Sequence, residues 1–168
     1  MNSDDLNILC EPKGPWCLKV ICTHSILTDG VLSFRQRHPE AVCIFLRGKR
    51  MMTAHDLFDE FAAALQFPYY FGYNGNAFDE CLTDLSWLPA KMYILSIFDS
   101  SSFLANEPAQ LPLFVDAFER ICHQWGTPVK QGEAWDRPAL PFHILFHSTV
   151  EDIAKWPSRI MAIAETIS

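Results

Sequence analysis

The sequence predicts an α/β fold in which helices pack against a small three-stranded parallel sheet. Three short apolar runs, AVCIFLRG, KMYILSIFD and PFHILFHS, are rich in β-forming residues and are bounded by glycine, proline or polar residues. Such continuous apolar runs are typical of strands that are buried on both faces. Amphipathic helical patterns separate the runs, and strands that alternate with helices pair in parallel. At 168 residues the chain is long enough to bury the core of one domain.

The segments between the first two strands carry helix start and stop signals. Thr53 and Asp56 have the spacing of a capping box, so we expect a helix from Thr53 that Pro68 closes off. A second helix is expected to begin with Asn76 as its N-cap and to bury Cys81, Leu82 and their apolar neighbours. The later elements are expected in the order strand 91–99, helix 111–125, exposed loop 127–141, strand 141–148 and a C-terminal helix from about residue 150.

The first forty residues have a weaker pattern. We expect a strand over residues 17–23, for which a hairpin with residues 7–11 is one arrangement, and a helix over residues 26–37. The chain is therefore divided into an N-terminal extension packed on the core (1–40), a main domain (41–148) and a C-terminal helix (149–168).

The net charge of −7 is concentrated in the middle of the chain. Residues 51–119 hold ten acidic side chains against a single basic one, Lys91. A nucleic-acid-binding protein needs a basic footprint, so the composition argues against that class. The acidic segment is interpreted either as a solubilising face or as a surface for a basic protein partner, whose encounter it would accelerate.

Neither a secretory leader nor a membrane span is predicted. The N-terminal MNSDDLNIL is acidic, and the longest apolar runs are too short to cross a bilayer. The six cysteines are scattered without a C-x-x-C pair and are expected to be free, mostly buried thiols. These features predict a cytoplasmic protein without a membrane partner, and they leave the oligomeric state open.

The second helix carries a polar ridge. Asn76, Glu80 and Asp84 fall at i, i+4 and i+8, with Asp79 and Thr83 alongside and the apolar face opposite. An acid near the helix start, such as Asp79, stabilises the helix dipole. Asp84 lies near the C-terminal end and repels Glu80 one turn away, so the ridge is not explained by helix stability.

The loop before this helix combines turn residues with aromatic rings. Gly72, Asn74 and Gly75 are residue types that adopt left-handed backbone conformations, so YFGYNGN is expected to form a tight loop. Tyrosine is enriched at binding hot spots. We expect Phe71 to enter the core, whereas Tyr69 is open to either a core or a surface position.

The stretch FPYYFGYNGNAFDECLTDLSWLP resembles the signature of the barstar family, small bacterial inhibitors that occupy the active site of a ribonuclease toxin. The resemblance covers roughly residues 41–148. The positions that fit the signature are Phe67, Pro68, Tyr70, Phe71, Gly72, Asn74, Ala77, Cys81 and Leu82. It implies a barstar-like fold, no cofactor, and a basic protein toxin, in the first place a ribonuclease domain, as the partner.

The resemblance also implies which residues bind the partner. The family's key acid, just before Cys-Leu, corresponds to Glu80. Other matching interface positions are Tyr70, Asn74, Gly75, Asn76, Asp79 and Thr83, to which the ridge and the loop add Asp84 and Gly72. Three positions depart from the pattern: Glu80 is longer than the usual aspartate, Asn76 replaces a carboxylate, and Asp79 replaces a large aromatic. Whether Glu119, near the family's further acid, joins the interface is left open.

The sequence is also compatible with two alternative functions. The first alternative is an immunity or regulatory protein of the same fold, whose target is a toxin without ribonuclease activity or an endogenous partner. The less favoured alternative is a metal-dependent enzyme that uses His143 and His147, which share one face of a strand. No phosphate loop, dinucleotide fingerprint or nucleophile elbow occurs, so we predict neither catalysis nor a metal site.

Overall fold

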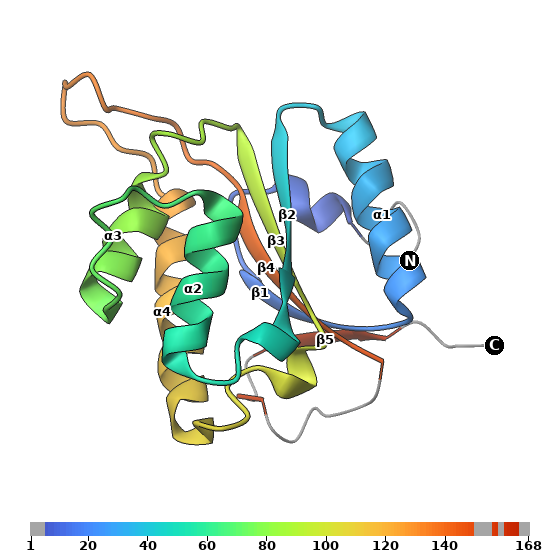
Figure 1. Cartoon of the computed structure of the whole chain (residues 1–168). Coiled ribbons are helices and arrows are strands. Elements are labelled where there is room, and N and C mark those ends of the chain that lie inside the picture. The colour runs from blue at the N-terminus through green and yellow to red at the C-terminus, as the bar shows by residue number, and fades with distance from the viewer. Residues whose placement is uncertain (1–5, 150–155, 158–159, 165–168) are drawn as a thin grey trace.

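The computed structural model describes residues 6–149, 156–157 and 160–164, and these residues form a three-layer α/β arrangement. A parallel sheet lies in the middle, with helix α1 (His24–Arg37) on one face and helices α2 (Ala54–Leu65), α3 (Gly75–Asp84) and α4 (Leu111–Trp125) on the other (Figure 1). Short 3-10 helices lie at residues Asn7–Cys10, Gly48–Arg50, Ser100–Ser102 and Pro108–Gln110.

The sheet has five strands in the order β2-β3-β4-β1-β5, and every pair is parallel. The strands are β1 (Cys17–Ile21), β2 (Ala41–Arg47), β3 (Met92–Phe98), β4 (Phe142–Ser148) and β5 (Met161–Ala164). Leu95 of β3 lies between Ile44 of β2 and Ile144 of β4, at the centre of the sheet. The α/β class, the parallel pairing and the three expected strands are confirmed.

The placement of the helices follows from the handedness of parallel crossovers. From β2 to β3 to β4 the chain advances in one direction, so right-handed connections put α2, α3 and α4 on one face. From β1 to β2 the chain moves across the sheet in the opposite direction, so the same handedness puts α1 on the other face. Both faces of β4 are therefore covered, and all seven of its residues are buried.

Two apolar cores result, one on each face of the sheet. The larger core joins α2, α3 and α4 to the sheet through stacked rings that include Phe58, Phe61 and Phe118. The smaller core lies under α1 and contains Leu27, Val31 and Phe34 of that helix. At the start of α2, Thr53 and Asp56 form the predicted capping box, with Oγ1 of Thr53 accepting from the backbone N–H of Asp56.

Three sequence expectations are wrong. The sheet has five strands rather than three, because β1 enters between β4 and β5. The hairpin between residues 7–11 and 17–23 does not form: residues Asn7–Cys10 form a 3-10 helix, and β1 pairs in parallel with β4 and β5. The C-terminal helix is replaced by strand β5 over Met161–Ala164, whereas residues 150–155, 158–159 and 165–168 lie outside the described part of the chain.

Other expectations are confirmed. All six cysteines are free, and four of them are buried. The helices predicted near residues 26–37 and 111–125 are present as α1 and α4. Among the described residues, no helix combines the length and the apolar character needed to cross a membrane.

Candidate functional site

The loop before α3 is held by the side chain of Asn74. Its Oδ1 accepts from the backbone N–H of Ala77 (3.0 Å), and its Nδ2 donates to the carbonyl of Gly72 (3.1 Å). Asn74 is therefore the N-cap of α3, and the expectation that Asn76 has this role is wrong. The helix begins two residues earlier than expected, because Asn74 has extended backbone angles and its side chain caps the backbone N–H of Ala77.

Helix α3 is fixed to the core by its apolar face. Phe78, Cys81 and Leu82 are buried, as predicted. The indole Nε1 of Trp125, on α4, donates to the backbone carbonyl of Leu82 (2.9 Å), which anchors the C-terminal half of α3. The opposite face of α3 is thus presented on a helix whose position the core determines.

The predicted polar ridge is present on that opposite face. Asn76, Glu80 and Asp84 are all exposed. Glu80 has no ion-pair partner among the described residues, and Asp84 accepts only from the hydroxyl of Ser86 (3.2 Å). Burial raises the pKa of the Cys81 thiol, and the charges of Glu80 and Asp84 raise it further.

Three tyrosines lie at the surface of the loop. Tyr69 is fully exposed, and Tyr70 and Tyr73 are 63% and 51% exposed. Phe71 enters the core, as expected, with its ring edge-on to Phe58 and Phe67. Tyr73 has a left-handed backbone (φ 49°), and its ring rests against Phe71 with centroids 4.8 Å apart. The buried ring of Phe71 therefore supports the exposed ring of Tyr73 in this loop.

Two of the predicted site residues are engaged within the chain. Oδ1 of Asp79 lies 2.7 Å from Nη1 of Arg120 on α4, so this acid is paired rather than free. The hydroxyl of Thr83 donates to the backbone carbonyls of Asp79 (2.8 Å) and Glu80 (3.1 Å). Among the described residues, the carboxylates of the ridge without an ion-pair partner are therefore those of Glu80 and Asp84.

A groove of about 300 Å³ separates α3 from α4 and continues the ridge. Asn76 and Asp79 line one wall, and Leu113, Ala117 and Arg120 line the other. Leu113 is 61% exposed, and sequence reasoning missed it. The sequence contained a signal for this wall of the groove, because Leu113, Ala117 and Arg120 fall at i, i+4 and i+7 and so share one face of the predicted helix. Arg120 lines this groove, whereas Glu119 does not.

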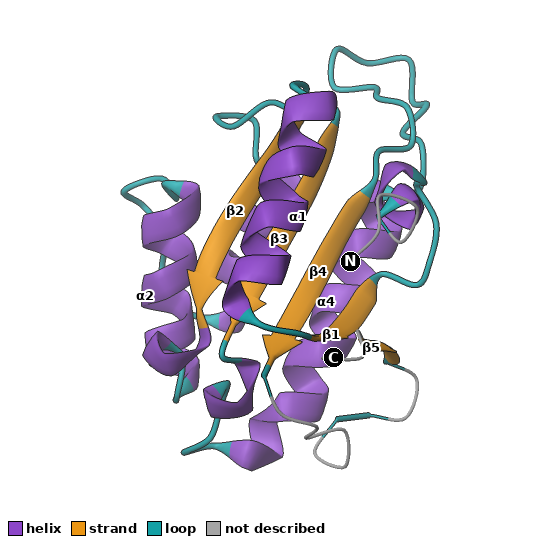
Figure 2. Cartoon of the chain, turned by 90° about the vertical axis from the view of Figure 1, so that its right-hand side faces the viewer, coloured by secondary structure: helices purple, strands orange, loops and turns teal. Residues whose placement is uncertain are grey.

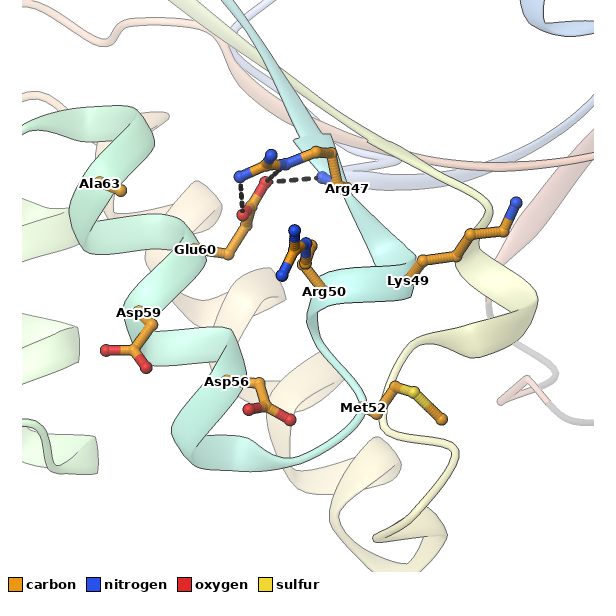
Figure 3. A pocket seen from close by; sticks show the side chains of 8 residues that line it. All are labelled: Arg47, Lys49, Arg50, Met52, Asp56, Asp59, Glu60 and Ala63. Carbon is orange, nitrogen blue, oxygen red and sulfur yellow. Dashed lines mark hydrogen bonds and ion pairs between the residues drawn. The ribbon is translucent and has the colours of Figure 1, made fainter.

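A second pocket, of about 530 Å³, lies beside β2 and the start of α2 (Figure 3). Arg47 forms a bidentate ion pair with Glu60, in which Nε lies 2.8 Å from Oε1 and Nη2 lies 2.7 Å from Oε2. The backbone N–H of Arg47 donates a third hydrogen bond to Oε1 of Glu60. Figure 3 shows Arg50 beside this pair and Lys49 directed away from it. The ion pair of Arg47 and Glu60 thus links the end of β2 to α2.

The alternative metal pair His143 and His147 does not converge. Both ring nitrogens of His143 lie at hydrogen-bond distance from backbone carbonyls, of Pro15 (3.1 Å) and Glu11 (3.0 Å). His147 instead contacts the carbonyl of Cys22 (3.0 Å). The two rings are therefore held by different parts of the N-terminal segment.

The chain was compared with protein-family models, curated protein sequences and solved structures. The family model described as Barstar (barnase inhibitor) matches residues 41–147, from the start of β2 almost to the end of β4. No curated protein sequence matches the chain. A solved structure titled "Structure of Drosophila ORC bound to AT-rich DNA and Cdc6" contains a chain that matches with a TM-score of 0.50 and 12% sequence identity. The match covers 95% of this chain but only 49% of that chain, and at this identity it reflects the fold alone.

Proposed function

The chain belongs to the barstar (barnase inhibitor) family, and from that membership we propose that it binds and blocks the active site of a cognate toxin, in the first place a ribonuclease. The contact surface is the exposed edge of α3 with the tyrosine loop before it. The observation that carries the proposal is the pair of free, exposed carboxylates, Glu80 and Asp84, on a helix that the core holds in place.

The chemistry of this surface suits a basic catalytic cleft. A ribonuclease binds the phosphates of its substrate with cationic groups, and carboxylates on a protruding helix are substitutes for those phosphates. Complementary charge steers the two proteins together and accelerates their association. Tyr70 and Tyr73 add exposed rings with few rotatable bonds, which contribute contact area at a small entropic cost.

The ridge has a defined centre. Glu80 lies between Asn76 and Asp84, and Asp79 next to it is neutralised by Arg120. We therefore assign Glu80 the main electrostatic role, Asp84 a supporting role, and Asn74 the role of shaping the loop. The remaining contact positions are Tyr70, Gly72, Gly75, Asn76, Asp79 and Thr83.

The experiment begins with the protein that co-purifies with this chain from its native host. Once identified by mass spectrometry, that protein is assayed for RNA cleavage with and without an equimolar amount of this chain. We expect cleavage to be blocked, and we expect Glu80→Gln to weaken binding by about 30-fold or more, the loss of about 2 kcal/mol that marks an interface hot spot. Glu133→Gln is the matched control, since it removes an exposed acid from the loop after α4.

A second target class is favoured by one observation. With Asp79 paired to Arg120 and an uncharged Asn76, the ridge carries fewer free charges than a strongly acidic inhibitor surface. Such a surface also suits a toxin with another activity or an endogenous partner. A co-purifying protein that cleaves no RNA but loses affinity for Glu80→Gln would select this class. Unchanged affinity for both Glu80→Gln and Asp84→Asn at low salt would refute the surface for either class.

A further inference from the structure

Three side chains with metal-ligating atoms meet at the carboxyl edge of the sheet, away from the ridge on α3. His24 is the first residue of α1 and follows β1, Asp99 follows β3, and His147 lies near the end of β4. Since β3, β4 and β1 are adjacent and parallel, their carboxyl ends lie at one edge of the sheet, beside the start of α1 (Figure 2). One ligand atom from each of the three residues lies within 4.8 Å of the others.

The position of this cluster in the topology is a usual place for a ligand. The connection from β1 leads across the sheet to β2, whereas β4 is followed by β5 on the other side of β1. The chain therefore departs in opposite directions from the neighbouring strands β4 and β1. In open α/β sheets, ligands bind outside the carboxyl ends of the strands at such a switch point.

The side chain of His147 is held so that its Nδ1 is available as a ligand atom. Its side chain is fully buried, and its Nε2 lies 3.0 Å from the carbonyl oxygen of Cys22. Because a carbonyl oxygen only accepts, Nε2 carries the proton and Nδ1 keeps its lone pair. That buried Nδ1 has no hydrogen-bond partner in the described part of the chain. A histidine oriented by a carbonyl through one nitrogen is the usual support for metal binding through the other.

His24 and Asp99 complete the set. Nε2 of His24 lies 3.0 Å from Oδ1 of Asp99, and the ring of His24 stacks on Phe98. The second carboxylate oxygen of Asp99 is paired with Lys49 (3.1 Å), which leaves Oδ1 directed at the histidine. Asp99 has a left-handed backbone (φ 50°), a conformation that aspartate adopts more readily than most residues.

From this geometry we propose that His24, Asp99 and His147 form a site for a divalent transition metal such as zinc. Two imidazoles and one carboxylate, with a further position open, are a donor set used for catalytic zinc and for non-haem iron. Zinc–nitrogen bonds of about 2.1 Å keep ligand atoms within about 4.2 Å of each other. We expect the half-exposed side chain of His24 to rotate slightly when metal binds, so that the ligand atoms move from within 4.8 Å to this spacing.

The site gives the N-terminal extension a role. Asp99 and His147 lie within the region that matches the family model, whereas His24 lies outside it. Bound metal would therefore link β1 and α1 to the main domain at the edge of the sheet, and the ligand set exists only in a chain that has this extension.

Zinc titration of the metal-free full chain by isothermal calorimetry tests the site. We expect one zinc ion per chain, with affinity at least about tenfold lower in His24→Ala and in Asp99→Asn. His55→Ala is the matched control, because His55 pairs with Asp59 (3.3 Å) on the surface of α2 without a buried histidine nearby. The imidazole NMR signals of His24 and His147 are expected to move on zinc addition while those of His55 stay in place.

Two outcomes overturn the proposal. One is the absence of stoichiometric zinc binding by the wild-type chain. The other is equal affinity of the wild type, His24→Ala and Asp99→Asn, since the ion would then bind elsewhere, for example at one of the thiols. His24 is half-exposed, so its replacement leaves the core intact and the test does not depend on a folding defect.

Discussion

Replacement of Phe78 by alanine tests whether the core holds α3 in place. The side chain is 2% exposed, and its ring centroid lies 5.1–6.2 Å from those of five other phenylalanines, namely Phe58, Phe61, Phe67, Phe114 and Phe118. Burial of a phenylalanine contributes about 1.5–3 kcal/mol, and aromatic pairs add about 0.5–1.5 kcal/mol each. Because the cavity left behind relaxes only in part, we expect Phe78→Ala to lower the free energy of unfolding by about 3–5 kcal/mol.

Urea unfolding followed by tryptophan fluorescence and circular dichroism measures this loss. With a slope of about 2 kcal/mol per molar urea, the midpoint should fall by roughly 1.5–2.5 M. Phe78→Leu, which retains much of the apolar volume, should lose clearly less. Leu113→Ala is the surface control on the neighbouring helix, because Leu113 is 61% exposed, and its effect should stay within about 0.5 kcal/mol.

A loss below about 1 kcal/mol in Phe78→Ala, at an unchanged slope, would refute the reasoning. Helix α3 would then be held by something other than the phenylalanine cluster. The phenylalanine cluster would then not be the support that presents Glu80 and Asp84 to a partner.

Three further predictions concern other parts of the chain. Asn74→Ala removes the N-cap of α3 and should cost about 1 kcal/mol in urea unfolding, whereas Asn76→Ala, at an exposed position in the first turn, should cost clearly less. Burial alone would raise the pKa of Glu60, but hydrogen bonds from Arg47 and the charges of Arg47 and Arg50 outweigh it and hold the pKa below its ordinary 4.5. The stability from Glu60 is therefore fully present above pH 4.5 and lost as the pH falls through the lower folded-state value, so thermal melts of Glu60→Gln should decline less on acidification than those of the wild type; an equal decline would contradict this. Burial raises the pKa of Cys43 to about 11, so its alkylation by iodoacetamide at pH 8, followed by mass spectrometry, should be roughly 100-fold slower than that of a thiol at the ordinary 9.0, and labelling at an ordinary rate would exclude the shift.

Local signals in the sequence were sufficient for most elements of the main domain. The capping box at Thr53 and the amphipathic stripe of α2 depend only on residues within one or two turns, and the structure has both. The same holds for the ridge, because helical spacing alone puts Asn76, Glu80 and Asp84 on one face. The N-cap was misplaced because Asn74 and Asn76 are equally good caps by residue type, and only the backbone angles of the loop distinguish them.

The sequence by itself thus determined the α/β class, the parallel pairing and the acidic edge of α3, since each rests on periodicity over a few neighbouring residues. Only the tertiary structure decided which distant segments meet. Strand β1 was not expected beside β4, because nothing in a single strand specifies its neighbour, and β5 was expected as a helix. The pairing of Asp79 with Arg120 and the meeting of His24, Asp99 and His147 depend on those long-range placements. Residues that lie far apart in the chain acquire their common chemistry only when the sheet brings the ends of its strands to one edge.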